Sequence, residues 1–176
     1  MDTWTPNFSW ITPQLAVGGS FPAAHAERLA TEHGIRAVVD LRGEAQDDEV
    51  LMRRHGIALL HLPTPDMCGV APAHLDDGVA FACEWIDRGE RVLIHCEHGI
   101  GRSATLALCV MVSRGAAPLD ALEQMKTRRA LVSPSPEQFA CWCGWLEQHR
   151  MRLRAAWRVP EFDAFQAIAY RHLRTG

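Results

Sequence analysis

The pattern of apolar and polar positions divides the chain into two kinds of segment, which alternate along it. Short apolar runs that stop in loops predict buried strands, and longer stretches with an apolar residue every three or four positions predict helices. Strands are expected at residues 8–18 (two, with a turn at Thr12-Pro13), 37–39, 57–62 and 91–94. Helices are expected at residues 23–33, 46–55, 73–88, 102–112, 119–127 and 136 to about 150. This alternation predicts an α/β fold, with a central, mostly parallel sheet of four to five strands flanked by helices on both faces.

The loops that follow the predicted strands point to a site. Sheets of this kind bind ligands beyond the carboxyl ends of their strands. Three loops leave strands at that edge, and they carry Arg42, Asp66 and Cys96. We therefore expect these three side chains to converge.

Composition narrows the class of protein. A chain of 176 residues, 48% apolar and 22% charged, suits a folded domain, and a net charge of -3 gives no general attraction to nucleic acid or anionic membranes. The first residues lack a secretory-signal pattern, and no apolar run reaches the ~18–20 residues of a membrane span. The six cysteines form no paired C-x-x-C zinc set. A reduced, cytoplasmic protein is the expectation.

The chain divides near residue 150. Residues 1–150 are expected to form the catalytic domain, and 151–176 a C-terminal helical extension packed on or beside it. Arg150, Arg154 and Arg158 recur at helical spacing. A solvated helix face is the favoured interpretation, and a basic stripe that recruits an acidic partner is the alternative.

One segment combines a strand end, two glycines and a helix start. It reads His95-Cys96-Glu97-His98-Gly99-Ile100-Gly101-Arg102-Ser103. Successive backbone N–H groups in such a turn can point inward, and the helix N-terminus behind them favours an anion. A cysteine in that field is expected to ionise, so Cys96 is a candidate nucleophile. Arg102 adds a planar fork suited to two phosphate oxygens.

The same segment matches the pattern H-C-x-x-G-x-x-R-S. It resembles the phosphate-binding loop of the protein tyrosine phosphatase superfamily, and looks most like its small dual-specificity branch, over residues 8–148. The resemblance implies phosphate-ester hydrolysis through a phosphocysteine on Cys96, with Arg102 as phosphate clamp, His95 tuning the thiol and Ser103 stabilising the departing thiolate. It also implies a substrate-binding loop made of Glu97, His98, Gly99, Ile100, Gly101 and Arg102. Thiolate attack needs no metal, and no cofactor is expected.

The family also uses a general acid on a separate loop. Pro63-Thr64-Pro65-Asp66 resembles the acid loop of compact members, which makes Asp66 the candidate, with a solvated turn residue as the alternative. Cys68 lies two residues after Asp66, so closure of that loop could bring it near Cys96 for a protective disulfide, although a bystander role is favoured.

For two accessory residues, Gln138 and Arg42, a structural role is favoured over a functional one. Gln138 could place the hydrolytic water, but a surface helix position is preferred. Arg42, together with Asp40, could line the pocket rim, but a structural ion pair is preferred. Cys141 and Cys143 lie at i and i+2 of a helix, so packing is preferred to a redox pair.

The substrate is expected to be a phosphorylated protein or peptide carrying phosphotyrosine, with phosphoserine and phosphothreonine as further candidates. If Glu97 faces the pocket, its carboxylate should disfavour phosphoinositides. A phosphatase for phosphoinositides or other small phosphate esters stays an alternative. So do a phospho-binding pseudo-phosphatase and a thiol-based sulfurtransferase or arsenate reductase.

Overall fold

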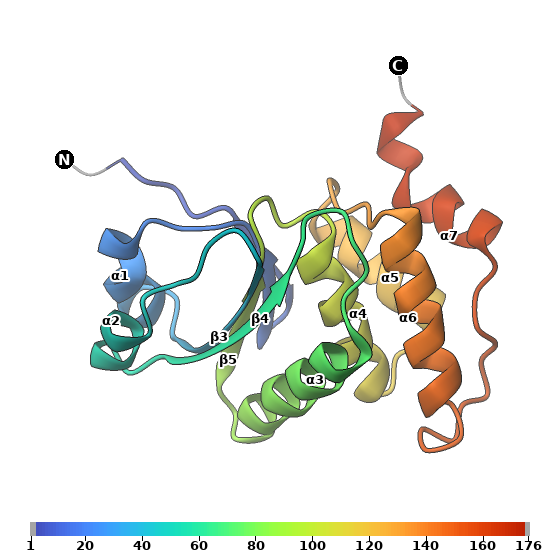
Figure 1. Ribbon diagram of the computed structural model, residues 1–176, viewed down its shortest axis with the longest axis horizontal. Helices are drawn as coiled ribbons and strands as arrows, with labels where there is room; N and C mark the ends of the chain where they lie inside the picture. The colour runs from blue at the N-terminus through green and yellow to red at the C-terminus, as the bar shows by residue number, and fades with distance from the viewer. Residues whose placement is uncertain (1–2, 175–176) are drawn as a thin grey trace.

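The structure is a computed structural model that describes residues 3–174 as a five-stranded sheet between two layers of helices (Figure 1). The strands are β1 (Phe8–Thr12), β2 (Leu15–Gly18), β3 (Ile35–Arg42), β4 (Ala58–Thr64) and β5 (Arg91–His95). Their order is β1-β2-β5-β3-β4. The β1–β2 pair is antiparallel, and the other pairs are parallel. The predicted α/β class with a mostly parallel sheet is confirmed.

Helices cover both faces of the sheet. On one face lie the 3-10 turn η1 (Ala23–His25), α1 (Ala26–Thr31) and α2 (Glu49–Arg54); on the other lie α3 (Pro72–Asp87), α4 (Arg102–Ser113), α5 (Pro118–Arg128), α6 (Pro136–His149) and α7 (Phe162–Ala169), and the 3-10 turn η2 (Arg171–Leu173) follows α7 (Figure 1). The helix expected at 46–55 begins later, because the Asp48 side chain accepts the Leu51 N–H and caps it there. Within residues 3–174, no helix is both long and apolar enough to span a membrane.

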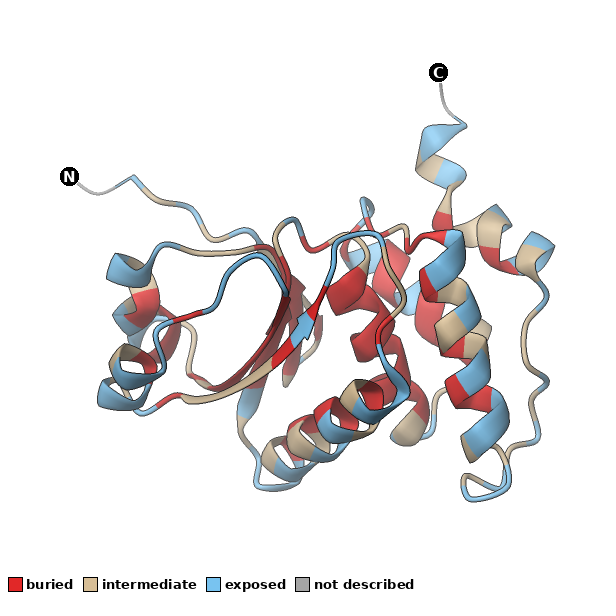
Figure 2. Ribbon diagram, in the orientation of Figure 1, coloured by how far each residue is buried: buried red, intermediate tan, exposed pale blue. Residues whose placement is uncertain are grey.

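Strand β3 explains how one sheet serves two cores. Successive side chains of a strand point to opposite faces. Accordingly Val39 and Leu41 pack with α3 and α4, while Val38 packs with α1 and α2. Helix α4 is buried along nearly its whole length, as Figure 2 shows, which is why its sequence is apolar on all sides.

The segment after α6 joins the main core. Phe165 and Ala169 of α7 are fully buried there, and the Nζ of Lys126 on α5 donates a hydrogen bond of 2.6 Å to the Ala169 carbonyl. Helix α7 is thus tied to α5 by packing and by a buried hydrogen bond.

The prediction of a helical arginine stripe after α6 is wrong. Helix α6 ends at His149, and Arg154 has a φ of 49°, a left-handed conformation that breaks a right-handed helix. Arg158 follows in an irregular segment before α7. The three arginines therefore do not share a helix face.

Candidate active site

The phosphate loop (residues 96–102) connects the end of β5 to the start of α4 at the carboxyl edge of the sheet. Gly99 has a φ of +67°, a conformation that side chains other than glycine rarely adopt, and a Cβ there would lie 2.4 Å from the backbone of Gly18. The end of β2 holds the loop by backbone hydrogen bonds from Cys96 to the Gly18 carbonyl and from Ser20 to the Glu97 carbonyl. The first glycine of the pattern seen in the sequence, Gly99, is thus required by a close approach of β2.

Cys96 lies at the floor of this loop, 3% exposed. Its Sγ is 3.3 Å from the Ser103 hydroxyl. Burial by itself would raise the pKa of Cys96, but hydrogen bonds from the Ser103 hydroxyl and from the backbone amides of Ser103 and Gly99, together with the charge of Arg102, outweigh burial and lower that pKa. The lowered pKa agrees in direction with the expected ionisation of Cys96.

Arg102 is 1% exposed, and hydrogen bonds hold the edge of its guanidinium formed by the two terminal nitrogens. Its two terminal nitrogens each donate a 2.7 Å hydrogen bond to the Glu44 carboxylate, and Nη1 also donates to the Thr64 carbonyl at 2.8 Å. A guanidinium has five N–H donors. The Nε–H is buried and has no partner among the described residues, and one N–H of Nη2 is not used by Glu44. This free edge supplies the two parallel donors that a phosphate group would need.

Asp66 follows β4 and reaches over the same site. Its Oδ1 lies 3.5 Å from Nη2 of Arg102, and its side chain is 64% exposed. The neighbouring Met67 has a φ of +64°, its N–H donates to the Asp66 carboxylate, and its carbonyl accepts the Ser135 hydroxyl at 2.8 Å. A left-handed methionine costs about 1–2 kcal/mol, so these two hydrogen bonds stabilise an otherwise unfavourable turn. The turn holds Asp66 beside Arg102, at the edge of the space over Cys96.

A cavity of about 100 Å³ opens over Cys96. It is lined by Asp66, Met67, Cys96, His98, Ile100, Gly101, Arg102, Ser133 and Gln138. Pockets for drug-sized ligands measure roughly 300–1,000 Å³, so this one is sized for a small group such as a phosphoryl group. The three residues expected to converge do so only in part, because Cys96 and Asp66 line the cavity and Arg42 does not.

Two residues of the predicted substrate-binding loop lie elsewhere. Glu97 points away from the cavity: its carboxylate accepts the Ser20 hydroxyl at 3.2 Å and lies 3.5 Å from Nη1 of Arg42. Gly99 shapes the loop from behind and does not line the cavity. The argument that Glu97 repels multiply phosphorylated ligands from within the pocket therefore does not apply.

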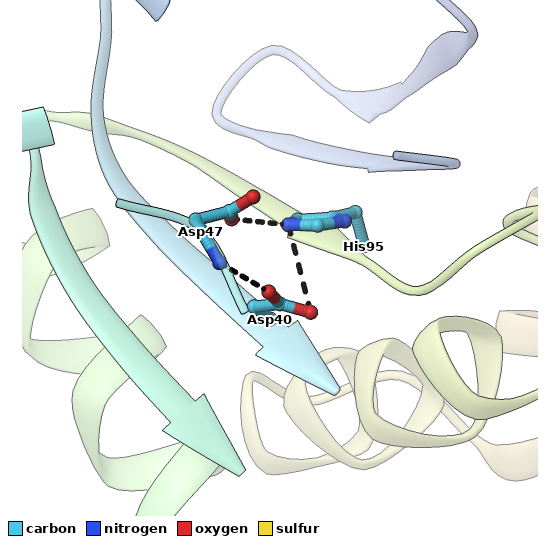
Figure 3. Close-up of side chains that lie close together, drawn as sticks. All are labelled: Asp40, Asp47 and His95. Atoms are coloured by element: carbon cyan, nitrogen blue, oxygen red, sulfur yellow. Dashed lines mark hydrogen bonds and ion pairs between the residues drawn. The ribbon is translucent and has the colours of Figure 1, made fainter. Parts of the chain in front are cut away.

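Arg42 belongs to a buried ion-pair network beneath the loop, the favoured interpretation of its role. Its Nη2 lies 3.0 Å from carboxylate oxygens of both Asp40 and Asp47. His95 joins them through a 2.6 Å contact between Nε2 and Asp47 (Figure 3). Asp40, Asp47 and His95 have the residue types of a metal site. However, Arg42 and His95 already pair with these carboxylates, so we assign the cluster to charge pairing.

Three residues of the site escaped the sequence reasoning or were misplaced by it. Glu44, in the stretch 43–48 after β3, was overlooked as the partner of Arg102. Gln138 is no surface residue: it is 1% exposed and forms a capping box with Ser135. It also packs against Gly101, because a Cβ added to Gly101 would lie 2.4 Å from Oε1 of Gln138. Arg129 is also buried, and its guanidinium donates to the carbonyls of His98 and Gly99. A charged residue two positions after a strand end was the available signal for Glu44.

The stretch that follows Arg129 connects the phosphate loop to α7. The Ser133 N–H donates to the Ile100 carbonyl at 3.0 Å, and the Tyr170 hydroxyl donates to the Pro134 carbonyl at 2.6 Å. Lys126 Nζ donates to the carbonyls of both Val132 and Ala169. The C-terminal helix thereby braces the segment behind the loop.

The cysteines outside the loop have different surroundings. All six thiols are free, and Cys68 does not line the cavity. Burial raises the pKa of Cys141 and raises that of Cys143 to about 11. The packing interpretation of these two cysteines fits their environment, while a disulfide between Cys68 and Cys96 stays a prediction.

A buried, ionisable cysteine in a strand–loop–helix cradle, backed by an arginine with a free edge, defines a cysteine-dependent phosphatase. The sequence matches the family model described as "PTP-SAK: Swiss Army Knife protein, DSP-PTPase phosphatase domain" over residues 5–172. The chain therefore belongs to this family of the protein tyrosine phosphatase superfamily, as the loop motif predicted.

Known relatives agree with this assignment. Phosphatidylglycerophosphatase and protein-tyrosine phosphatase 1 of Mus musculus is 29% identical over 128 residues, which are 68% of this chain and 66% of that protein. Dual specificity protein phosphatase 5 of Homo sapiens is 28% identical over 127 residues, 71% of this chain and 32% of that protein. The matched segment thus spans just under two thirds of the first relative and about one third of the second.

Solved structures share the fold. The crystal structure of PTPMT1 in complex with PI(5)P superposes with a TM-score of 0.77 at 22% identity, covering 82% of this chain and 97% of that one. Tk-PTP in the active form gives a TM-score of 0.73 at 26% identity, covering 82% and 99%. The first likeness concerns the fold alone.

Proposed function

We propose that this phosphatase hydrolyses phosphotyrosyl proteins through a phosphocysteine intermediate on Cys96, with phosphoseryl and phosphothreonyl proteins as further substrates. The observation that carries the proposal is the pairing of a thiol whose pKa is lowered with the free edge of Arg102 at the floor of one small cavity. A thiolate there has a phosphate-sized space above it and an arginine to bind the phosphate.

In the first step, Cys96 Sγ forms a bond to phosphorus while the bond from phosphorus to the ester oxygen breaks. Asp66 donates a proton to the departing oxygen, a role supported by its place across the cavity from Cys96. The Nε–H and the remaining Nη2–H of Arg102 bind two phosphoryl oxygens, whose charge is held through the transition state.

In the second step, water attacks phosphorus and the bond from Sγ to phosphorus breaks. Asp66, now a carboxylate, accepts the proton of that water. The Ser103 hydroxyl, 3.3 Å from Sγ, donates a hydrogen bond to the thiolate as it leaves. Gln138 lines the cavity beside Gly101 and is placed to hold the water.

The cavity wall supports substrates with a single phosphate. Among its lining residues, Arg102 is the one arginine or lysine, so a second phosphate would find no strong cation there. Met67 and Ile100 supply apolar surface at the wall, which suits the ring of a phosphotyrosine. The remainder of the substrate must lie outside a space of about 100 Å³.

A lipid phosphate is the second candidate. It is favoured by the 29% identical mouse relative, whose name covers both phosphatidylglycerophosphatase and protein-tyrosine phosphatase. Glu97, turned toward Arg42 and Ser20, does not oppose it.

A substrate panel separates these proposals. We would measure kcat/KM for a phosphotyrosyl peptide, matched phosphoseryl and phosphothreonyl peptides, phosphatidylglycerophosphate and PI(5)P in the same detergent, with Cys96→Ser as control. We expect the phosphotyrosyl peptide to be hydrolysed fastest, and Cys96→Ser to bind it without turnover. A higher kcat/KM on either lipid would replace the protein-substrate assignment. Binding of the peptide without turnover by the wild type would instead indicate a phospho-binding module.

A further inference from the structure

The imidazole of His95 has an oxygen acceptor at each of its two nitrogens. Its Nε2 lies 2.6 Å from Oδ2 of Asp47, and its Nδ1 lies 3.1 Å from the carbonyl oxygen of Cys96. The ring is fully buried. A neutral imidazole has one N–H and one lone pair, so one of these two contacts would set a lone pair against an oxygen. Only the imidazolium ion donates at both positions.

The charges around the ring support the same protonation state. Asp40 of β3 lies 3.8 Å from Nε2, and Asp47 comes from the carboxylate loop (residues 43–48) that follows β3 (Figure 3). Arg42 pairs with both carboxylates and extends toward Glu97. The two buried carboxylates are balanced only when Arg42 and His95 both carry a positive charge.

The remaining neighbours of His95 add little charge. The ring of Phe21 lies 5.1 Å away, centroid to centroid, and shields one face of the imidazole. Burial opposes the charged ring, but hydrogen bonding and attraction to Asp47, with the charge of Asp40, outweigh burial and raise the pKa of His95. The raised pKa agrees with what the two acceptors require.

We propose that Asp47 is a positioning residue that keeps His95 doubly protonated, so that His95 donates to the Cys96 carbonyl and sets a fixed positive charge beside the nucleophile. This inference rests on the proposed function in one respect, namely that the thiolate of Cys96 is the reacting group. The carboxylate loop then acts on the phosphate loop at both ends, through Asp47 on His95 and through Glu44 on Arg102.

The matched pair of variants is Asp47→Asn and Asp48→Asn. An asparagine at 47 can still accept one hydrogen bond from Nε2, but it lacks the charge that retains the second proton. Asp48 is exposed in the same loop and caps α2, and asparagine caps as well as aspartate, so its replacement removes one charge and leaves the fold unchanged. Urea unfolding of both variants checks that they are folded.

The direct readout is the ¹⁵N NMR spectrum of the His95 side chain in histidine-labelled protein. We expect both ring nitrogens of the wild type and of Asp48→Asn to stay protonated well above about 6.5, the ordinary pKa of histidine. In Asp47→Asn, the ring should become neutral near or below that pH. A neutral His95 in the wild type above that pH overturns the inference, and this measurement needs neither a variant nor an active enzyme.

The second readout is the pH dependence of Cys96 alkylation by iodoacetamide. Loss of the imidazolium charge should raise the thiol pKa of Asp47→Asn, so that its alkylation profile shifts toward higher pH by about one unit, with a rate up to about tenfold lower below the shifted pKa. Asp48→Asn should match the wild type, and an unchanged profile in Asp47→Asn overturns the inference. If the wild type hydrolyses no phosphate ester while His95 is an imidazolium, the proposed function fails and the assignment of Asp47 stands.

Discussion

The carboxylate of Glu44 lies 2.7 Å from both terminal nitrogens of Arg102. The guanidinium of Arg102 lowers the pKa of Glu44 to about 2, so the carboxylate is ionised at any pH used for an assay. This contact occupies both terminal nitrogens of the guanidinium and leaves its buried Nε–H without a partner among the described residues, in a side chain that lines the cavity. Glu44 therefore sets the orientation of the group expected to bind phosphate.

Replacing Glu44 with glutamine should lower kcat/KM on an aryl phosphate. Hydrogen bonds to charged groups contribute about 1.5–3 kcal/mol, which corresponds to roughly 10- to 100-fold. The measurement is steady-state kinetics, with Glu49→Gln on the exposed first turn of α2 as the control that should change little. A variant at Glu44 with wild-type kcat/KM would show that Arg102 keeps its orientation without this partner.

Cys96 should react with iodoacetamide before any other cysteine. Because its pKa is lowered, the thiolate is present at a pH below the ~8.5 at which a free thiol ionises, and alkylation near pH 6 should be fast. Burial raises the pKa of Cys83 and raises that of Cys143 to about 11, so both should stay unmodified there. Mass spectrometry of the modified peptides over time measures this order, and inorganic phosphate should protect Cys96. Equal labelling of the three cysteines would contradict it.

Asp66→Asn should impair catalysis according to the leaving group. If Asp66 donates a proton, phosphate esters with a basic departing oxygen should lose about 10²-fold, within the usual range for a general acid. Esters of acidic phenols should lose much less, because their oxygen can depart as an anion. The measurement is kcat/KM for a series of aryl phosphates of graded leaving-group pKa. A uniform loss across the series would mean that Asp66 only holds its loop.

Alanine substitutions at Gly56 and Gly99 can separate two costs of adding a side chain: strain in a left-handed backbone and collision with neighbouring atoms. Gly56 has a φ of +74° with open space around it, while Gly99 has a φ of +67° with the Gly18 backbone 2.4 Å from the position of a Cβ. Gly56→Ala should lower the free energy of unfolding by about 1–2 kcal/mol from backbone strain alone. Gly99→Ala should lose a further 1–3 kcal/mol or so from overpacking, and most of its activity. Urea denaturation compares them, and equal losses would show that β2 moves aside.

Much of the fold could be predicted from the chain because its signals are local. The apolar runs at β3 and β5 and the helical spacing at α3 each span a few consecutive residues, and the structure has elements close to those positions. The end of α6 was predicted to within about one residue, but the helical spacing expected for Arg150, Arg154 and Arg158 was wrong, because no proline or glycine in residues 150–158 marks the irregular chain there. Helix α6 ends at His149, and the left-handed conformation of Arg154 prevents the chain after it from continuing that helix.

The chemistry of the phosphate loop is likewise contained in consecutive residues. Cys96, Arg102 and Ser103 share one turn and one helix start, so their spacing alone brings them together once β5 and α4 form. The two loop glycines, Gly99 and Gly101, could also be assigned there, although the neighbours that require them, Gly18 and Gln138, could not.

The groups that orient this loop come from distant segments. Glu44 and Asp47 reach Arg102 and His95 because β3 lies beside β5 in the sheet, and Arg129 reaches the loop carbonyls from the end of α5. Such contacts depend on strand order and on the path of a loop, and neither leaves a periodic trace in the chain. The side chain of Glu97 turned toward Arg42 for the same reason, since the buried charge that attracts it lies on another strand. Residue spacing along the chain was therefore enough to predict Cys96 and Arg102 as nucleophile and phosphate-binding arginine. Only the pairing of β3 with β5 determined that Glu44 and Asp47 would contact Arg102 and His95.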